Sequence, residues 1–262
     1  MASNETYIRK FYSDPSREDS RLSASRCGSL EFQYTTKVAG KYINPDSSVV
    51  EIGCGTGCYG IHFAEMCKEY IGIDLSPEQI STFNNKIKSR QLNNVKAIVG
   101  DAVNLNEIED FRFDVVLALG PMYHLPKDER DTVLSECKRI CRDQGIIILA
   151  YANKIGAYVN GCLLIPDKYP DKKLSHSVLK EGMSDEMPGL FYMTMPEEIE
   201  AQAVSNGLIV LRHAGVDFIF NPEVINAMTD KQFEAWLDIC DYMCDSPTCT
   251  GLSTHALIVC RK

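Results

Sequence analysis

The sequence predicts an α/β protein with a doubly wound, mostly parallel sheet. Two observations carry this prediction: short apolar runs alternate with helix-length segments up to residue 151, and three of the early runs end in an acidic residue. Alternating strands and helices favour a parallel sheet with helices on both faces. Ligands of such sheets lie at the carboxyl ends of the strands, so the acidic ends mark the expected site.

Seven strands are expected along the chain. Asp114–Leu119 shows the pattern well, because a continuous apolar run suits a strand that is covered on both faces. The seven are Val49–Ile52, Tyr70–Ile73, Ala97–Val99, Asp114–Leu119, Ile146–Tyr151, Gly207–Phe220, a range that includes the residues leading into the strand, and His255–Cys260.

Helices are expected between and before these strands. Apolar residues recur every fourth position from Leu30 to Tyr42, which is a helical spacing, and Asp14-Pro15-Ser16 breaks any earlier helix. Ser76–Gln79 and Thr229–Gln232 have the form of capping boxes and each predicts a helix start. The other predicted helices are Ser29–Tyr42, Cys58–Cys67, Lys127–Cys141 and Pro196–Asn206. Residues 152–193 lack a clean period and are long for a connection.

Composition limits the class of protein. The 262 residues predict a single domain, 1–262, and the net charge of −9 argues against a nucleic-acid partner, since phosphate binding relies on Lys and Arg. No secretory leader and no apolar run of about 18 residues is present, so we expect a cytoplasmic protein with no membrane segment. The eleven cysteines lack the spacing of a metal site, so reduced thiols and no metal are expected.

The turn after the first strand predicts a cofactor site. Gly53, Gly55 and Gly57 alternate after Val49-Val-Glu51-Ile, so a ligand can lie against bare backbone. Gly55–Gly60 also fits the dinucleotide pattern G-x-G-x-x-G, with Asp74 about twenty residues on. S-adenosylmethionine is the better interpretation, because Glu51 would repel a pyrophosphate.

Acids at the ends of three successive strands would then contact one adenosyl ligand from end to end. Glu51 would face its amino-acid end, Asp74 would accept both ribose hydroxyls, and Asp101 would accept the exocyclic amine of adenine.

The chain resembles the class I S-adenosylmethionine-dependent methyltransferases over about residues 35–150. The matching segments are Val49–Gly57, Ile71–Pro77, Gly100–Ala102, Phe113–Leu125 and Gly145–Ala150. The resemblance is to small bacterial-type members with Gly-Pro-x-Tyr-His-Leu after the fourth strand, here Gly120–Leu125.

The resemblance implies a Rossmann-like fold whose seventh strand is antiparallel and lies beside the fifth. It implies an N-terminal lid or helix at 1–42, a cofactor-binding half at 43–151, and a substrate half at 152–262 with a cap insertion at about 152–193. S-adenosylmethionine would be the cofactor and S-adenosylhomocysteine the product. The implied cofactor-binding residues are Glu51, Gly53, Cys54, Gly55, Gly57, Asp74, Leu75, Asp101, Ala102 and Leu119.

The expected reaction is direct displacement at the sulfonium methyl by a small-molecule acceptor, in a monomer or homodimer. His124 is the candidate general base and Tyr123 would position the acceptor or orient the base; alternatively, His124 lines the cofactor or bonds a backbone carbonyl. Gly-Pro-Met-Tyr departs from the Asn/Asp-Pro-Pro-Tyr motif, which argues against adenine or glutamine acceptors. The other hypotheses are an RNA-base methyltransferase, a nicotinamide oxidoreductase and a non-catalytic S-adenosylmethionine-binding protein.

Overall fold

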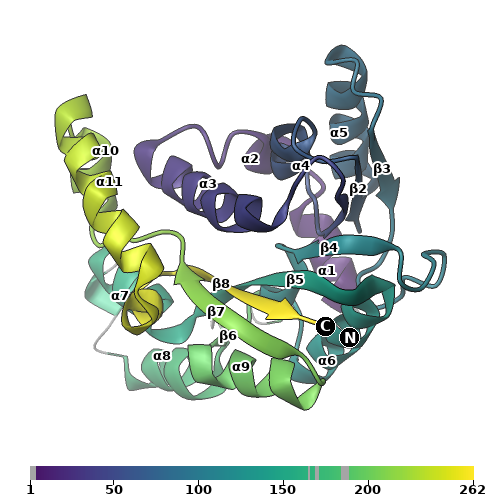
Figure 1. The fold of residues 1–262 in the computed structure, drawn as a ribbon. Coiled ribbons are helices and arrows are strands. Elements are labelled where there is room, and N and C mark those ends of the chain that lie inside the picture. Colours follow the sequence, from purple (N-terminus) through teal and green to yellow (C-terminus); the bar gives the residue numbers. More distant parts are fainter. Residues whose placement is uncertain (1–3, 165, 169–170, 184–188) are drawn as a thin grey trace.

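The computed structural model describes residues 4–164, 166–168, 171–183 and 189–262, and its centre is an eight-stranded sheet (Figure 1). The strand order is β3-β2-β1-β4-β5-β8-β7, with β6 paired to β5 off this path. β8 is antiparallel to both of its neighbours and the other pairs are parallel. The strands are β1 Ser48–Ile52, β2 Glu69–Asp74, β3 Val95–Val99, β4 Phe113–Ala118, β5 Cys141–Asn153, β6 Met193–Thr194, β7 Ile209–Gly215 and β8 His255–Arg261.

The predicted fold class is confirmed, including the antiparallel last strand beside β5. The two-residue β6 was not predicted. The sixth predicted strand is shorter than expected, because β7 ends at Gly215 and the segment after it is a loop.

Two apolar clusters cover opposite faces of the sheet. Neighbouring strand residues point to opposite faces, so Val49 belongs to one cluster and Val50 to the other. Figure 1 shows α3 and α4 over one face, and α6 and α9 over the other. The residue ranges of the helices outside the N-terminal segment and the insertion at 152–193, together with α3, are α3 Arg26–Ala39, α4 Cys58–Phe63, α5 Pro77–Ser89, α6 Lys127–Ile140, α9 Pro196–Ser205, α10 Pro222–Ala227 and α11 Asp230–Asp245.

Two predicted helix features differ in the structure. The helix predicted over Cys58–Cys67 ends at Phe63, because Asn94 Nδ2 donates to the carbonyls of Ala64 and Cys67 and holds this stretch as a turn. Ser76 caps α5 through the Gln79 N–H, but the expected reciprocal bond is missing because the Gln79 side chain reaches Tyr12 instead. The capping box at Thr229 is complete.

The N-terminal segment forms two short helices before α3. α1 covers Asn4–Phe11 and α2 covers Ser16–Asp19, and the break between them falls at Asp14-Pro15, as predicted. The implied lid, 1–42, thus comprises these helices, α3 and a 3-10 turn at Gly40–Tyr42; residues 1–3 lie outside the described residues.

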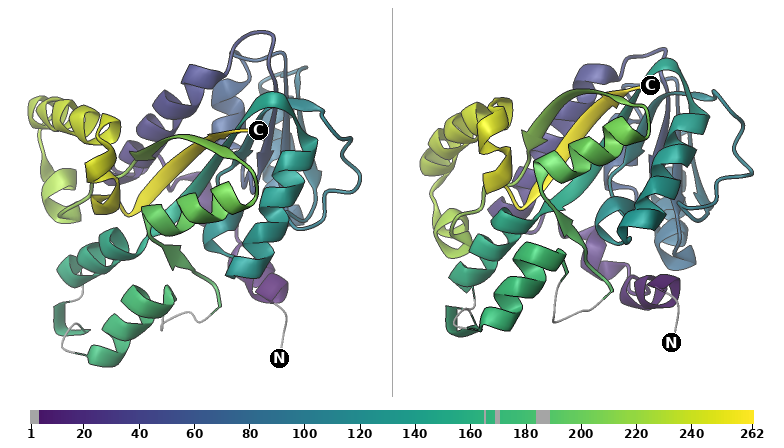
Figure 2. Two further views of the ribbon diagram at one scale, coloured as in Figure 1. Left: turned by 60° about the horizontal axis from the view of Figure 1, so that its bottom comes forward. Right: turned by 90° about the horizontal axis from the view of Figure 1, so that it is seen from below.

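The implied cap insertion is mainly helical. It contains α7 Lys154–Leu164, a 3-10 turn at Pro166–Lys168, α8 Lys172–His176 and a π-helical turn at Ser177–Glu181. Both views in Figure 2 show these helices projecting from one end of the sheet. Residues 165, 169–170 and 184–188 of this segment lie outside the described residues.

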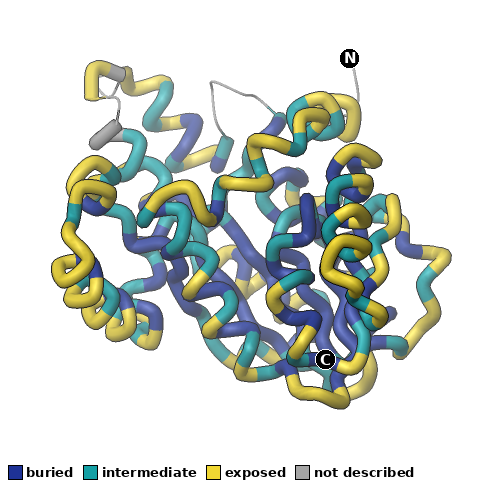
Figure 3. The backbone as a smooth tube through the Cα atoms, turned by 90° about the horizontal axis from the view of Figure 1, so that it is seen from above, coloured by how far each residue is buried: buried dark blue, intermediate teal, exposed yellow. Residues whose placement is uncertain are grey.

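Burial follows the layers of the fold. The strands are mostly buried and the outer helices carry the exposed residues (Figure 3). Among the helices of the described ranges, none is long and apolar enough to cross a bilayer.

Candidate active site

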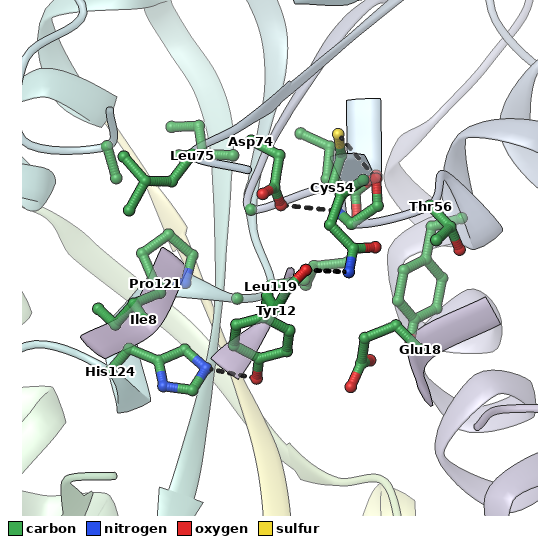
Figure 4. Close-up of a pocket in the computed structure, with 18 of the residues that line it drawn as sticks. Ile8, Tyr12, Glu18, Cys54, Thr56, Asp74, Leu75, Leu119, Pro121 and His124 are labelled. Atoms are coloured by element: carbon green, nitrogen blue, oxygen red, sulfur yellow. Dashed lines mark hydrogen bonds between the residues drawn. The ribbon is translucent and has the colours of Figure 1, made fainter. Parts of the chain in front are cut away.

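A pocket lies at the carboxyl ends of β1–β4, between the sheet and the N-terminal segment (Figure 4). Its empty volume is about 1010 Å³, counting the open space at its mouth. The N-terminal segment contributes Ile8, Tyr12, Glu18, Arg21, Leu22 and Glu31 to the lining. The strand ends, and the turns and helix starts that follow them, contribute Glu51–Thr56, Cys58, Tyr59, Asp74, Leu75, Gln79, Gly100–Ala102, Leu119–Pro121 and Tyr123–Leu125.

Every residue expected at the site lines this pocket except Gly57. Gly57 instead precedes α4, and a Cβ on it would lie 2.1 Å from the Phe83 ring. Because Gly57 has no side chain, the Phe83 ring can pack directly against the backbone of the turn.

Asp74 ties the glycine turn to the end of β2. Its Oδ2 accepts the Gly55 N–H at 2.8 Å and its Oδ1 accepts the Ser76 N–H at 2.9 Å. Burial raises the pKa of this carboxyl, although these backbone hydrogen bonds oppose the shift. A carboxylate has about four lone-pair positions, so two remain for ligand hydroxyls.

Glu51 is a buried acid at the end of β1, with 1% of its surface exposed. It accepts the Tyr70 hydroxyl at 2.6 Å. Burial raises its pKa to about 8, the Tyr70 bond lowers it in part, and the charge of Asp74 raises it further. Glu51 is therefore mostly protonated at neutral pH, and a cationic ligand would favour its ionised form.

His124 is held in one neutral tautomer. Its Nδ1 lies 2.7 Å from the Leu190 carbonyl oxygen, which can only accept, so Nδ1 carries the proton. Nε2 then accepts the hydroxyl of Tyr12 at 2.8 Å (Figure 4). Burial lowers the pKa of His124 to about 4, so the ring is neutral at physiological pH.

A chain of charges forms the wall beside Tyr123. Arg21 donates to Glu31 from Nη1 and Nη2 and to Glu18 from Nε. Glu31 also lies 3.9 Å from His255 Nδ1, and the Tyr123 ring packs against the rings of His124 and His255.

His255 is the cation at the far end of this chain. Its Nδ1 lies 2.6 Å from Asp217 Oδ2. Burial lowers its pKa, but the carboxylates of Asp217 and Glu31 outweigh this and raise the pKa to about 9. Glu31, Asp217 and His255 are also the one group of metal-ligand type within the described ranges. Because Arg21 occupies Glu31 and Asp217 holds the protonated imidazole, we interpret the group as an ion-pair network.

Sequence reasoning missed several lining residues from the N-terminal segment. Tyr12, Glu18 and Glu31 carry no motif, because they reach the pocket through tertiary packing alone. Arg21 also lines the pocket, and its N–H groups donate to carboxylates of the chain itself.

The insertion at 152–193 contacts His124 and Tyr123 of the site. None of its described residues lines the pocket, but Leu190 accepts from His124 and the Phe191 ring lies 5.0 Å from the His124 ring. Tyr192 N–H donates to the Tyr123 carbonyl. Trp236 packs against Phe220 and one of the two apolar clusters, and it does not line the pocket.

Comparisons with known proteins agree with this geometry. Residues 49–145 match a family model described as a methyltransferase domain. The ribosomal protein L11 methyltransferase of Clostridium botulinum is 31% identical over 83 residues, which cover 31% of this chain and 26% of that relative.

Two solved structures share the fold over nearly the whole chain. Magnesium protoporphyrin IX methyltransferase from Synechocystis PCC 6803, with bound S-adenosylhomocysteine, has a TM-score of 0.61 at 15% identity and covers 99% of this chain and 100% of that one. The PH0226 protein of Pyrococcus horikoshii OT3 has a TM-score of 0.59 at 17% identity and covers 100% and 99%.

Residues 49–145 therefore match a methyltransferase domain, and the chain as a whole shares the fold of these solved structures. The family match falls on the glycine turn and the three acids that predicted an S-adenosylmethionine site.

Proposed function

We propose that this protein transfers a methyl group from S-adenosylmethionine to a small-molecule acceptor by direct displacement. The observation that carries the proposal is one pocket lined both by the acids at the ends of β1, β2 and β3 and by the hydrogen-bonded Tyr12–His124 pair. In this pocket Asp74 would bind the ribose, Asp101 the adenine amine, and Glu51 the ammonium of the methionine part.

The chemistry requires a nucleophile in line with the methyl group and a place for its proton. The acceptor atom forms a bond to the methyl carbon as the carbon–sulfur bond breaks, and both electrons of that bond go to sulfur. The acceptor proton moves to the Tyr12 oxygen as the Tyr12 proton moves to His124 Nε2. A neutral His124 with a low pKa is basic enough to take this proton, because a freshly methylated hydroxyl is a strong acid.

The charge of the lining narrows the acceptor class. Among the described lining residues the acids are Glu18, Glu31, Glu51, Asp74 and Asp101, and the one Arg or Lys is Arg21. Two carboxylates already occupy Arg21. A neutral or cationic acceptor therefore suits the pocket better than a carboxylate, a phosphate or an RNA.

Methyl transfer from isotopically labelled S-adenosylmethionine to a panel of amines, alcohols, phenols, thiols and carboxylates tests the proposal. We expect label in a neutral or cationic acceptor and a loss of about 10²- to 10⁴-fold in kcat for His124→Gln. Gln33→Met on the exposed face of α3 serves as the unaffected control. Binding of S-adenosylhomocysteine without transfer to any member would instead favour a non-catalytic binding protein, and transfer only to RNA would favour the RNA-base alternative.

A further inference from the structure

Gln79 is a buried polar side chain of the pocket that sequence reasoning assigned to helix capping alone. It lies in the first turn of α5 and only 1% of its surface is exposed. Its Nε2 donates to the main-chain carbonyl of Tyr12 at 2.9 Å. Since a carbonyl only accepts, this bond fixes which end of the amide is nitrogen and which is oxygen.

The other end of the amide is unpaired. Gln79 Oε1 is buried and has no hydrogen-bond partner among the described residues. Buried polar atoms in native proteins nearly always have a partner, so an acceptor left unpaired at a pocket wall can take a hydrogen bond from a ligand donor. The nearest atom to a Cβ built on Gly55 is this same oxygen, at 3.9 Å, so Oε1 lies beside the bare backbone of the glycine turn.

Gln79 thus stands between the glycine turn and the residue that contacts His124. Tyr12 is held at both ends, since its carbonyl accepts from Gln79 and its hydroxyl donates to His124. Ser76 Oγ also approaches the Tyr12 carbonyl, at 3.4 Å, but lies closer to Glu78 Oε2, at 2.8 Å. Gln79 is therefore the main polar link between α5 and Tyr12.

We infer that Gln79 couples cofactor binding to the placement of Tyr12. Its Oε1 accepts an O–H or N–H donor of the ligand at the glycine turn, and its Nε2 fixes Tyr12 over His124. The inference rests on the proposed function for the identity of that ligand. In S-adenosylmethionine the donor is a ribose hydroxyl or the α-ammonium group.

Calorimetric titration with S-adenosylhomocysteine tests the acceptor role of Oε1, with Gln79→Met and the control Gln33→Met. We expect Gln79→Met to weaken binding by about 3- to 10-fold for a hydroxyl donor and by about 10- to 100-fold for an ammonium donor. Titration with adenosine separates the two sources, because adenosine has the ribose but lacks the ammonium. A loss shared by both ligands assigns the ribose, and a loss for S-adenosylhomocysteine alone assigns the ammonium.

Hydrogen exchange of residues 5–22, with and without S-adenosylhomocysteine, tests the link to Tyr12. The ligand should slow exchange there in the wild type and in Gln33→Met. Gln79→Met loses the donor to Tyr12, so a saturating concentration of the ligand should give this variant no such protection.

The two proposals fail differently. A wild type that does not bind S-adenosylhomocysteine refutes the proposed function. A wild type that binds, with Gln79→Met equal to it in both affinity and protection, overturns the role of Gln79 alone.

Discussion

Gly55 and Gly57 offer a matched pair of substitutions, because both have left-handed backbone but differ in the space around them. Their φ angles are 51° and 80°. An added Cβ at Gly57 would lie 2.1 Å from the ring of Phe83, whereas the nearest atom at Gly55 is 3.9 Å away. Phe83 is fully buried and cannot move aside, because it also packs tightly against Gly60 and Gly72.

The expected losses of stability follow from these distances. A left-handed Ala costs about 1–2 kcal/mol, and this is the whole expected effect of Gly55→Ala. Overpacking a tight core adds about 1–3 kcal/mol, so Gly57→Ala should lose about 2–5 kcal/mol in total. Against a typical stability of about 5–15 kcal/mol, only the second variant approaches unfolding.

The assays are urea unfolding followed by circular dichroism, and calorimetric titration with S-adenosylhomocysteine. Gly55→Ala should remain folded yet bind at least about tenfold more weakly, because its methyl group lies where the ligand approaches the backbone and Gln79 Oε1. The reasoning is refuted if Gly57→Ala is as stable as Gly55→Ala, or if Gly55→Ala binds like the wild type.

Two further predictions concern pH. With Glu51 at a pKa of about 8, the affinity for S-adenosylmethionine should fall as pH drops from about 7.5 to 6, since the carboxyl protonates while the ligand keeps its α-ammonium group; titration of Glu51→Gln should show no such decline. For His255, the folded pKa of about 9 lies above the ordinary value of 6.5, so the contribution of its ion pair to the free energy of unfolding is complete below pH 6.5 and is lost as pH rises through 9. The His255 side chain is 29% exposed, so this contribution is at most about 3 kcal/mol. Urea unfolding at pH 6 and pH 10 should show a smaller decline in the free energy of unfolding for Asp217→Asn than for the wild type. Equal declines would contradict the ion-pair interpretation.

The sequence was sufficient where the signal is local. The glycine turn, the acids after β1, β2 and β3, and Gly120–Leu125 are short patterns whose place at the strand ends follows from the parallel sheet. Of the residues that these patterns placed at the site, all but one line the pocket. Gly57 is the exception, because a periodic glycine does not reveal whether it faces a ligand or a buried ring such as Phe83.

The remainder of the site depends on packing that no pattern records. Tyr12 meets His124 across 112 positions of the chain, and Glu31 on α3 approaches His255 on β8. The side chain of Gln79 illustrates the same limit. Its position three residues after Ser76 predicts a capping box, but the carbonyl of Tyr12 competes for the amide and replaces that bond.

Calorimetric titration with S-adenosylhomocysteine, on wild type, Asp74→Ala and the exposed control Asp46→Ala, tests the central claim most directly. We expect micromolar binding to wild type and control. Loss of two hydrogen bonds to a carboxylate, at about 1.5–3 kcal/mol each, should weaken binding to Asp74→Ala by about 10²- to 10⁴-fold. Absence of binding to the wild type, together with binding of NADH, would contradict the account and restore the dinucleotide interpretation of the glycine turn.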